Sequence, residues 1–423
     1  MQTAFQGKTQ TPASHAFGWA VARTDALTAT VPTYVYAVVF ASFCIVMGLL
    51  WDIMWHMSIG RDGLFSAPHL VIYVGALVSG LFSGYQILSL TLRKNHPDRP
   101  RSVRFWGIFY GSLGAMFCVW GALAMLTSAP FDDWWHSTYG LDVEILTPPH
   151  TILVLGMMMV LFGAMIGVLA LQNQVNRDGH QAIANPRDKT RIRFLFALSA
   201  AFLLTVLFVL LSESMGSWAS YHSSYYTTAA IIFPIFLMAV GRASSLRYPI
   251  TIITAIYMLT LALPSWVLPL FPATPKLGPV LNPITHYQAY FFPLLLVIPG
   301  FALDWLNRRF SGQVINGKQT RKPLSDWWLA VIAGVVFMVI FLIVQWPFGG
   351  FLHESPHARN WFFLSGSWSY NNDPNWEYRY KFNPYFNQST TDFALNFAQA
   401  LLMAMASARI GLWWGSWMKR VVR

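Results

Sequence analysis

Two stretches of the sequence repeat the same order of side chains that could do chemistry. They run from Trp51 to Gly75 and from Phe131 to Gly156. Each has an aromatic–Asp pair, Trp-His four residues later, Gly-x-Asp, and Pro-His at the start of the next apolar run. One carboxylate and two imidazoles are suitable ligands for Cu, Zn or Fe. The repeat therefore predicts two metal sites of the same kind.

The candidate ligands follow from this spacing. They are Asp52, His56 and His69 in the first stretch, and Asp132, His136 and His150 in the second. The Asp and the first His of each copy are four residues apart, so on a helix they share one face. The last His opens the next apolar segment, and the loop between them can fold it back towards the pair. The second copy has one extra residue before this last His.

Charged residues in the two loops are expected to support the ligands. Asp62 and Asp142 occupy matching places, where a carboxylate could hold an imidazole N–H or the loop itself. Arg61 could pair with Asp62, and Glu144 could alter the charge of the second site. The alternative interpretation of the repeat is a hydrogen-bonded polar belt at a membrane surface.

The composition predicts a membrane protein. Hydrophobic residues make up 55% of the 423 residues and charged residues only 11%. Because a span needs ~20 apolar residues, the chain has room for many. We expect an all-α, polytopic membrane helix bundle with about ten transmembrane helices. The expected spans are approximately 32–52, 68–92, 105–128, 149–171, 194–212, 225–241, 249–264, 288–306, 327–345 and 392–413.

The basic residues indicate the orientation of the chain. They account for the net charge of +11, but they lie in alternate loops rather than in one patch, so nucleic acid is not expected as a partner. Basic loops stay on the cytoplasmic side, which places both termini there. The candidate ligands then lie at the extracytoplasmic face, and the expected partner is the lipid bilayer. Cys44 and Cys118 fall in apolar runs, so no disulfide framework is expected.

These features predict five regions. They are a cytoplasmic tail (1–31), a four-helix unit with both metal motifs (32–173), further membrane helices that are a candidate degenerate repeat (174–345), an extracytoplasmic aromatic loop expected to be a packed cap (346–391), and a last transmembrane helix with a basic C-terminus (392–423). In the third region, Glu213 and His222 are candidates for an additional ligand or a proton-relay pair. The default interpretation for such a histidine is a hydrogen-bonded side chain at the membrane surface.

The run from Asp52 to His69, D-x-x-W-H-x-x-x-x-R-D-x-x-F-x-x-P-H, resembles the copper-binding segment of the C subunit of the copper membrane monooxygenases. This family includes the particulate methane, ammonia and alkane monooxygenases. The resemblance covers about residues 32–171. It implies one copper site of Asp and two His, then a second of Asn and two His with one extra residue before the last His. Asp132 departs from that pattern, because Asp replaces Asn and adds a negative charge.

The resemblance implies a function as well as ligands. We expect a copper-binding membrane monooxygenase or its metal-bearing subunit, with one or two copper ions, that activates O₂ and oxidises a small apolar substrate or ammonia. Iron and zinc are the alternative metals. Quinol is a candidate electron donor, and other monooxygenase or oxidase subunits are candidate partners. The membrane would be the cytoplasmic (inner) or intracytoplasmic membrane of a bacterium or archaeon. The alternatives are a non-catalytic protein for copper acquisition, storage or delivery, and an accessory subunit of a membrane oxidase complex.

Overall fold

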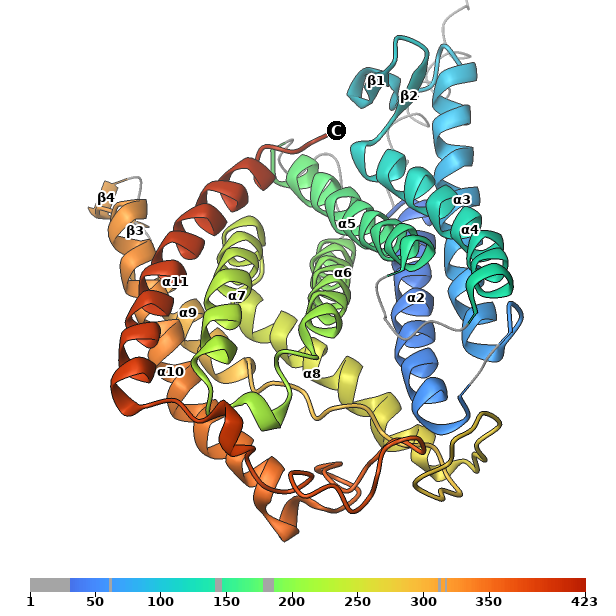
Figure 1. Ribbon diagram of the computed structural model, residues 1–423. Helices are drawn as coiled ribbons and strands as arrows, with labels where there is room; N and C mark the ends of the chain where they lie inside the picture. Colours follow the sequence, from blue (N-terminus) through green and yellow to red (C-terminus); the bar gives the residue numbers. More distant parts are fainter. Residues whose placement is uncertain (1–30, 61–62, 141–146, 178–185, 311–312, 316–317) are drawn as a thin grey trace, which may run out of the picture.

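A computed structural model describes the chain except for residues 1–30, 61–62, 141–146, 178–185, 311–312 and 316–317 (Figure 1). The described part is all-helical apart from two short hairpins. Its ten helices are α2 (Thr33–Ser58), α3 (Ala67–Leu92), α4 (Leu113–Tyr139), α5 (Pro148–Arg177), α6 (Pro186–Leu211), α7 (Ser223–Ala243), α8 (Pro249–Val267), α9 (Val297–Phe310), α10 (Asp326–Glu354) and α11 (Thr390–Met418). The hairpins join β1 (Val103–Phe105) to β2 (Phe109–Gly111), and β3 (Gln313–Ile315) to β4 (Lys318–Arg321).

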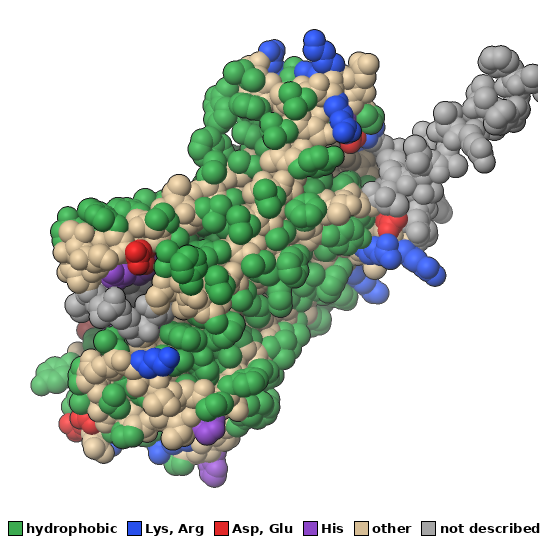
Figure 2. Space-filling view, turned by 90° about the vertical axis from the view of Figure 1, so that its right-hand side faces the viewer, with side chains coloured by type: hydrophobic (Ala, Val, Ile, Leu, Met, Phe, Trp, Pro, Cys, Tyr) green, Lys and Arg blue, Asp and Glu red, His purple; other side chains and the backbone are tan. Residues whose placement is uncertain are grey.

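The helices form a polytopic membrane bundle, as the composition predicts. Nine of those in the described ranges are long and apolar enough to cross a bilayer, with mean hydropathies between 1.3 and 2.8 over their most apolar windows. Hydrophobic side chains cover the middle of the face in Figure 2. This surface is apolar because lipid, rather than water, is its solvent. The protein is therefore a multi-pass integral membrane protein.

The chain order separates two groups of helices. In Figure 1, α2–α5 lie together on one side of the bundle, and α7, α10 and α11 lie on the other, with α6 between them. Consecutive helices run up and down, so α2 and α4 end, and α3 and α5 begin, at the same end of the bundle. The candidate ligands belong to these four helix ends. The sequence-based division into five regions stays a prediction.

The third expected span begins later than the sequence suggested. Residues 103–111 form the β1–β2 hairpin, and α4 starts at Leu113, where the Ser112 side chain accepts a hydrogen bond from the Ala115 N–H at 3.2 Å. The helix then continues to Tyr139. Because of this shift, the second Asp–His pair lies on the last turns of a continuous helix.

The eighth expected span, residues 288–306, is helical only from Val297. The preceding stretch is not helical, and its backbone must find partners outside a helix because lipid offers none. The Leu294 N–H donates to Tyr257 Oη at 3.3 Å, and the Leu295 N–H donates to Gln345 Oε1 at 3.3 Å. Gln345 Nε2 donates in turn to Tyr225 Oη at 2.9 Å. These neighbours replace the missing helical bonds.

Candidate metal centre

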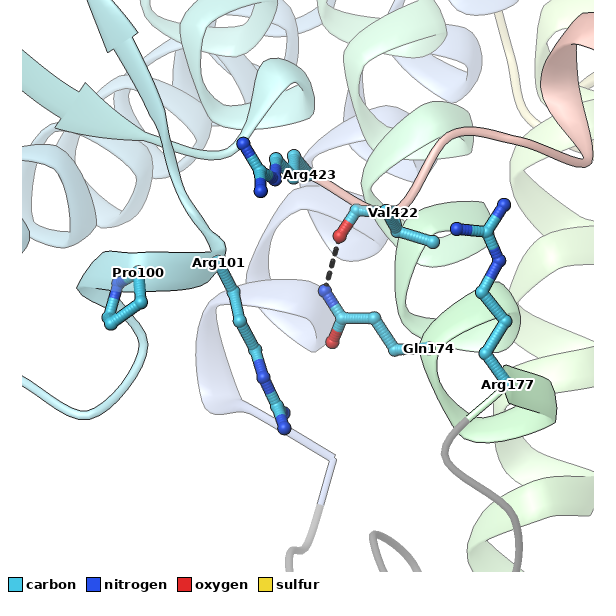
Figure 3. Close-up of a pocket in the computed structure, with 6 residues that line it drawn as sticks. All are labelled: Pro100, Arg101, Gln174, Arg177, Val422 and Arg423. Atoms are coloured by element: carbon cyan, nitrogen blue, oxygen red, sulfur yellow. Dashed lines mark hydrogen bonds between the residues drawn. The ribbon is translucent and has the colours of Figure 1, made fainter.

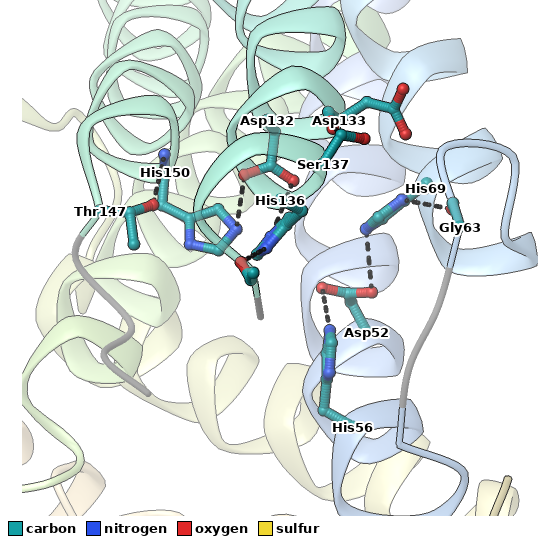
Figure 4. Close-up of polar contacts among 11 residues, drawn as sticks. Asp52, His56, Gly63, His69, Asp132, Asp133, His136, Ser137, Thr147 and His150 are labelled. Atoms are coloured by element: carbon teal, nitrogen blue, oxygen red, sulfur yellow. Dashed lines mark hydrogen bonds and ion pairs between the residues drawn. The ribbon is translucent and has the colours of Figure 1, made fainter. Parts of the chain in front are cut away.

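Asp132, His136 and His150 converge on one point at the ends of α4 and α5 (Figure 4). Nε2 of His136 lies 3.6 Å from Oδ2 of Asp132, and Nε2 of His150 lies 3.3 Å from Oδ1. Ligand atoms ~2.0–2.2 Å from a shared ion would lie about 3.0–3.6 Å from one another. Among the described residues, this is the only trio of His, Cys, Asp and Glu that offers one ligand atom each, all within 4.8 Å of one another.

The contact between Asp132 and His150 places a buried carboxylate oxygen beside an imidazole nitrogen. Within the described part of the chain, Asp132 Oδ1 is buried and makes no hydrogen bond, although His150 Nε2 is only 3.3 Å away. A carboxylate and imidazoles that approach in this way are suited to a shared cation. We refer to Asp132, His136 and His150 as the second trio.

Local contacts hold the His136 ring and the backbone of His150 in place. Nδ1 of His136 lies 3.1 Å from the Gly140 carbonyl oxygen, which can only accept a hydrogen bond. A neutral ring that donates through Nδ1 presents the lone pair of Nε2 to a metal. The Thr147 hydroxyl lies 3.4 Å from the His150 N–H in the first turn of α5, as a helix-capping side chain does.

Asp52, His56 and His69, the first trio, form a similar but more open arrangement. Nε2 of His69 lies 3.4 Å from Oδ1 of Asp52, and Nδ1 of the same ring lies 3.1 Å from the Gly63 carbonyl oxygen. Nε2 of His56 is 3.9 Å from Oδ2 of Asp52, and 52% of the His56 side chain is exposed. Figure 4 shows the two trios at the same end of the four helices. Of the two, only the second has its ligand atoms gathered for one ion.

The two copies of the motif share their helix packing as well as their polar residues. A Cβ on Gly75 of α3 would lie 2.8 Å from the Ala41 carbonyl oxygen of α2, and one on Gly156 of α5 would lie 2.8 Å from that of Gly121 of α4. Ala41 and Gly121 each precede the aspartate of their copy by eleven residues, and each glycine follows the last histidine by six. Close backbone contact in the same register therefore brings each histidine to its aspartate.

A glycine with positive φ also follows each Asp- and His-bearing helix, directly after α4 and one residue after the C-cap of α2. Gly60 and Gly140 each come four residues after the first histidine of their copy, with φ of 92° and 89°. This left-handed region favours glycine, because a Cβ would be strained there. The repeat is thus structural, and the glycine of each Gly-x-Asp element lies where the helix has ended.

Two loops from the second half of the chain hold the end of α2. The Met57 carbonyl oxygen accepts hydrogen bonds from the Tyr370 N–H and the Ser369 hydroxyl, both at 3.1 Å. The buried Ser58 hydroxyl accepts one from the Gln288 N–H at 2.7 Å. Burial also raises the pKa of the Tyr370 phenol, which stays neutral at ordinary pH. These contacts lie next to His56, and no signal in the sequence indicates them, because their partners are 230 and 312 residues away.

The remaining predicted site residues are placed differently. Arg61, Asp62, Asp142 and Glu144 lie outside the described residues. Glu213 follows the end of α6 and is exposed. His222 is the N-cap of α7: its Nδ1 lies 3.2 Å from the Ser224 N–H and 2.7 Å from the Ser224 hydroxyl. The geometry therefore gives His222 a helix-capping contact, and its suggested pairing with Glu213 stays a prediction.

The two histidines around the start of the aromatic loop after α10 lie in different local structures. His353 lies at the end of α10, where its Nε2 is 3.0 Å from the Lys381 carbonyl oxygen. His357 lies beyond the helix end, in a short 3₁₀ turn. Arg359 lies over the Tyr380 ring at 3.6 Å from its centroid. The expectation that this loop forms a cap stays a prediction.

No protein-family model, curated protein or solved structure matches this chain.

Proposed function

We propose that the chain is a copper-binding membrane protein related to the copper membrane monooxygenases, either the enzyme itself or its metal-bearing subunit. It would oxidise a small apolar substrate or ammonia with O₂. The observation that carries this proposal is the convergence of Asp132, His136 and His150 on one point. The spacing of the motifs, which resembles that of the family, supports copper over iron or zinc.

The second trio would hold the metal through two imidazole nitrogens and one carboxylate oxygen. Copper, when bound there, would supply the one-electron chemistry that O₂ activation needs. His136 would be kept in its metal-binding tautomer by the Gly140 carbonyl oxygen. Asp132 would balance the charge of the cation. The first trio would hold a second ion, with His56 more open to solvent.

Aromatic side chains beside the second trio support an apolar substrate. Trp135 contacts Tyr139 with ring centroids 4.6 Å apart, and Phe131 stacks on Trp134 at 5.8 Å. Trp134 and Tyr139 are 51% and 65% exposed on the helix end. This aromatic surface adjoins the expected bilayer, from which an apolar molecule could enter. A quinol donor, also lipid-soluble, would reach the protein by the same route.

A metal and turnover measurement tests the proposal. The full chain, purified in lipid nanodiscs, is expected to retain one or two copper ions by elemental analysis and to oxidise a short alkane, an alkene or ammonia with O₂ and a quinol. His150→Ala should lose copper and turnover. His96→Ala is the matched control, because His96 also lies beside an aspartate (Asp98, 3.9 Å) but in the basic loop after α3. Iron in place of copper would refute the family assignment but leave the site intact.

A second candidate function is copper acquisition, storage or delivery without catalysis. The exposure of His56 favours it, since an open ligand can pass a metal to another carrier. In that case the chain would bind copper and transfer it to a soluble chelator within minutes, without substrate oxidation even when membrane partner chains are present. Copper that is retained and supports turnover would exclude this candidate. An accessory subunit of an oxidase would instead show copper only in the assembled complex.

A further inference from the structure

Helix α11 is the least covered of the long apolar helices in the described ranges, and it lies at the edge of the bundle in Figure 1. Only 22% of its most apolar window is buried, against 33–67% for the other eight. One face packs against α7 and α10, and its buried members include Ala400, Ala404, Ala408 and Gly415. The opposite face of the helix is exposed.

Hydrogen bonds hold the C-terminal end of α11 in place. The segment that follows the helix lies against α5, where Gln174 Nε2 donates to the Val422 carbonyl oxygen at 2.6 Å (Figure 3). Asn173 Nδ2 donates to the carbonyl oxygens of Met418 at 2.9 Å and Val421 at 2.8 Å. The exposed face is therefore the surface of a fixed helix.

The exposed residues of α11 form a stripe with one polar member. They recur at steps of three and four residues along one side of the helix, and they are Leu395, Gln399, Leu402, Ala406, Ile410 and Trp413. Such steps are typical of the contact between two paired helices. The nearby Arg409 is turned towards α10, where its guanidinium lies over the Trp327 ring at 4.9 Å from the centroid.

Gln399 lies within the apolar depth of the bilayer. Gly334 of α10 packs against the backbone of Met405. Counting eight residues along each of these antiparallel helices brings Asp326 level with Trp413, and Asp326 forms an ion pair at 2.7 Å that marks a polar boundary. A hydrocarbon core of ~30 Å takes ~20 residues of helix, so from Trp413 it extends about six residues beyond Gln399.

Within the described part of the chain, the Gln399 amide makes no hydrogen bond. The other amide side chains of the long apolar helices differ from it. They either bond to another segment or lie in the last turn of their helix, and they are Gln86, Gln172, Asn173, Gln174, Asn176, Gln345 and Asn396. An amide that faces hydrocarbon without a partner is costly. Gln399 therefore calls for a partner from outside this chain.

We propose that the exposed stripe of α11 docks a second copy of the chain, with the two Gln399 side chains hydrogen-bonded to each other across a two-fold axis. Copies inserted in the same orientation present Gln399 at the same depth. An amide carries both donor and acceptor, so it can pair with its own copy, as a two-fold interface requires. Ala406 is small enough to allow close approach of the helices. This surface is separate from the metal centre on α2–α5.

The test measures dimerisation of the full chain in liposomes at low protein density by single-molecule photobleaching. The fluorophore is attached after Tyr385→Cys, a position 88% exposed in the outer loop, while the native Cys44 and Cys118 are buried. Gln399→Leu removes the amide, and Gln399→Asn keeps one. Thr127→Val is the matched control, because this exposed residue of α4 also loses a polar group, but its hydroxyl bonds to the carbonyl oxygen four residues back at 2.8 Å.

The wild type is expected to form dimers and no larger species. Their dissociation constant should rise about three- to thirtyfold in Gln399→Leu, in line with hydrogen bonds between membrane helices. Gln399→Asn should fall between the two, and Thr127→Val should match the wild type. A monomeric wild type, a dimer that Gln399→Leu does not weaken, or equal weakening by Thr127→Val would overturn the proposal. The measurement needs no bound metal, so its outcome is separate from that of the proposed function.

Discussion

Nε2 of His150 lies 3.3 Å from Oδ1 of Asp132, and Nε2 of His69 lies 3.4 Å from Oδ1 of Asp52. The same pair of atoms therefore meets at nearly the same distance in both copies of the motif. In both cases the histidine comes from the first turn of the second helix of a hairpin. Two predictions concern this relationship and the packing that produces it, and two concern hydrogen bonds elsewhere in the fold.

Asp132→Ala should weaken metal binding at the second trio by roughly 100-fold or more, since even the loss of an outer partner of a ligand costs about 10–100-fold. Competition with a chromogenic chelator measures the affinity. Asp133→Ala is the control, because this exposed neighbour points away from the trio in Figure 4. Asp52→Ala should leave the second trio loaded. A protein that keeps its full metal content in Asp132→Ala would contradict the assignment.

Gly156→Ala should destabilise the protein by about 1–3 kcal/mol, because the new methyl group would lie 2.8 Å from the Gly121 carbonyl oxygen and force α4 and α5 apart. Metal occupancy of the second trio should fall with the thermal unfolding temperature. Gly84→Ala, within α3, is the matched substitution, since nothing lies within 4 Å of a Cβ there. It should be neutral or stabilising, and an equal loss in both variants would argue against the close packing.

Ser58→Ala should release the start of the non-helical stretch before α9, because the Gln288 N–H loses its acceptor at 2.7 Å. The expected cost is about 1–3 kcal/mol, with faster hydrogen exchange at Gln288 and less metal at the first trio. Ser42→Ala is the control: this serine is equally buried in α2, and its hydroxyl donates to Val38 O within the helix at 2.8 Å. If both variants behave alike, the loop does not position His56.

Gln345→Leu should destabilise the non-helical part of the eighth expected span. The Leu295 N–H would lose its acceptor and Tyr225 its side-chain partner, in surroundings that offer no water. A loss of about 1–2 kcal/mol is expected, in line with hydrogen bonds inside membranes. Unfolding in mixed micelles measures it. Thr260→Val, which removes only a bond to Ile256 O in its own helix, should cost clearly less.

Much of this architecture was predictable from local sequence. Long apolar runs have no stable alternative to a helix in lipid, because every backbone group must be bonded internally. The expected helical class is therefore confirmed, and nine long apolar helices lie within the described ranges. The eighth expected span differs. Its residues are apolar enough to suggest a membrane helix, but the N–H groups of Leu294 and Leu295 donate to Tyr257 and Gln345 of other helices.

The candidate ligands were visible in the sequence because the repeat fixes their type, order and spacing. The sequence did not indicate which trio would have its three ligand atoms close enough together to hold one ion. That depends on where α3 and α5 meet their partners, on rotamers such as that of the exposed His56, and on loops that reach Met57 and Ser58 from more than 200 residues away. Residue type and spacing determine what a site can bind. Only the close contact of two helix backbones brings an imidazole within 3.3 Å of a carboxylate.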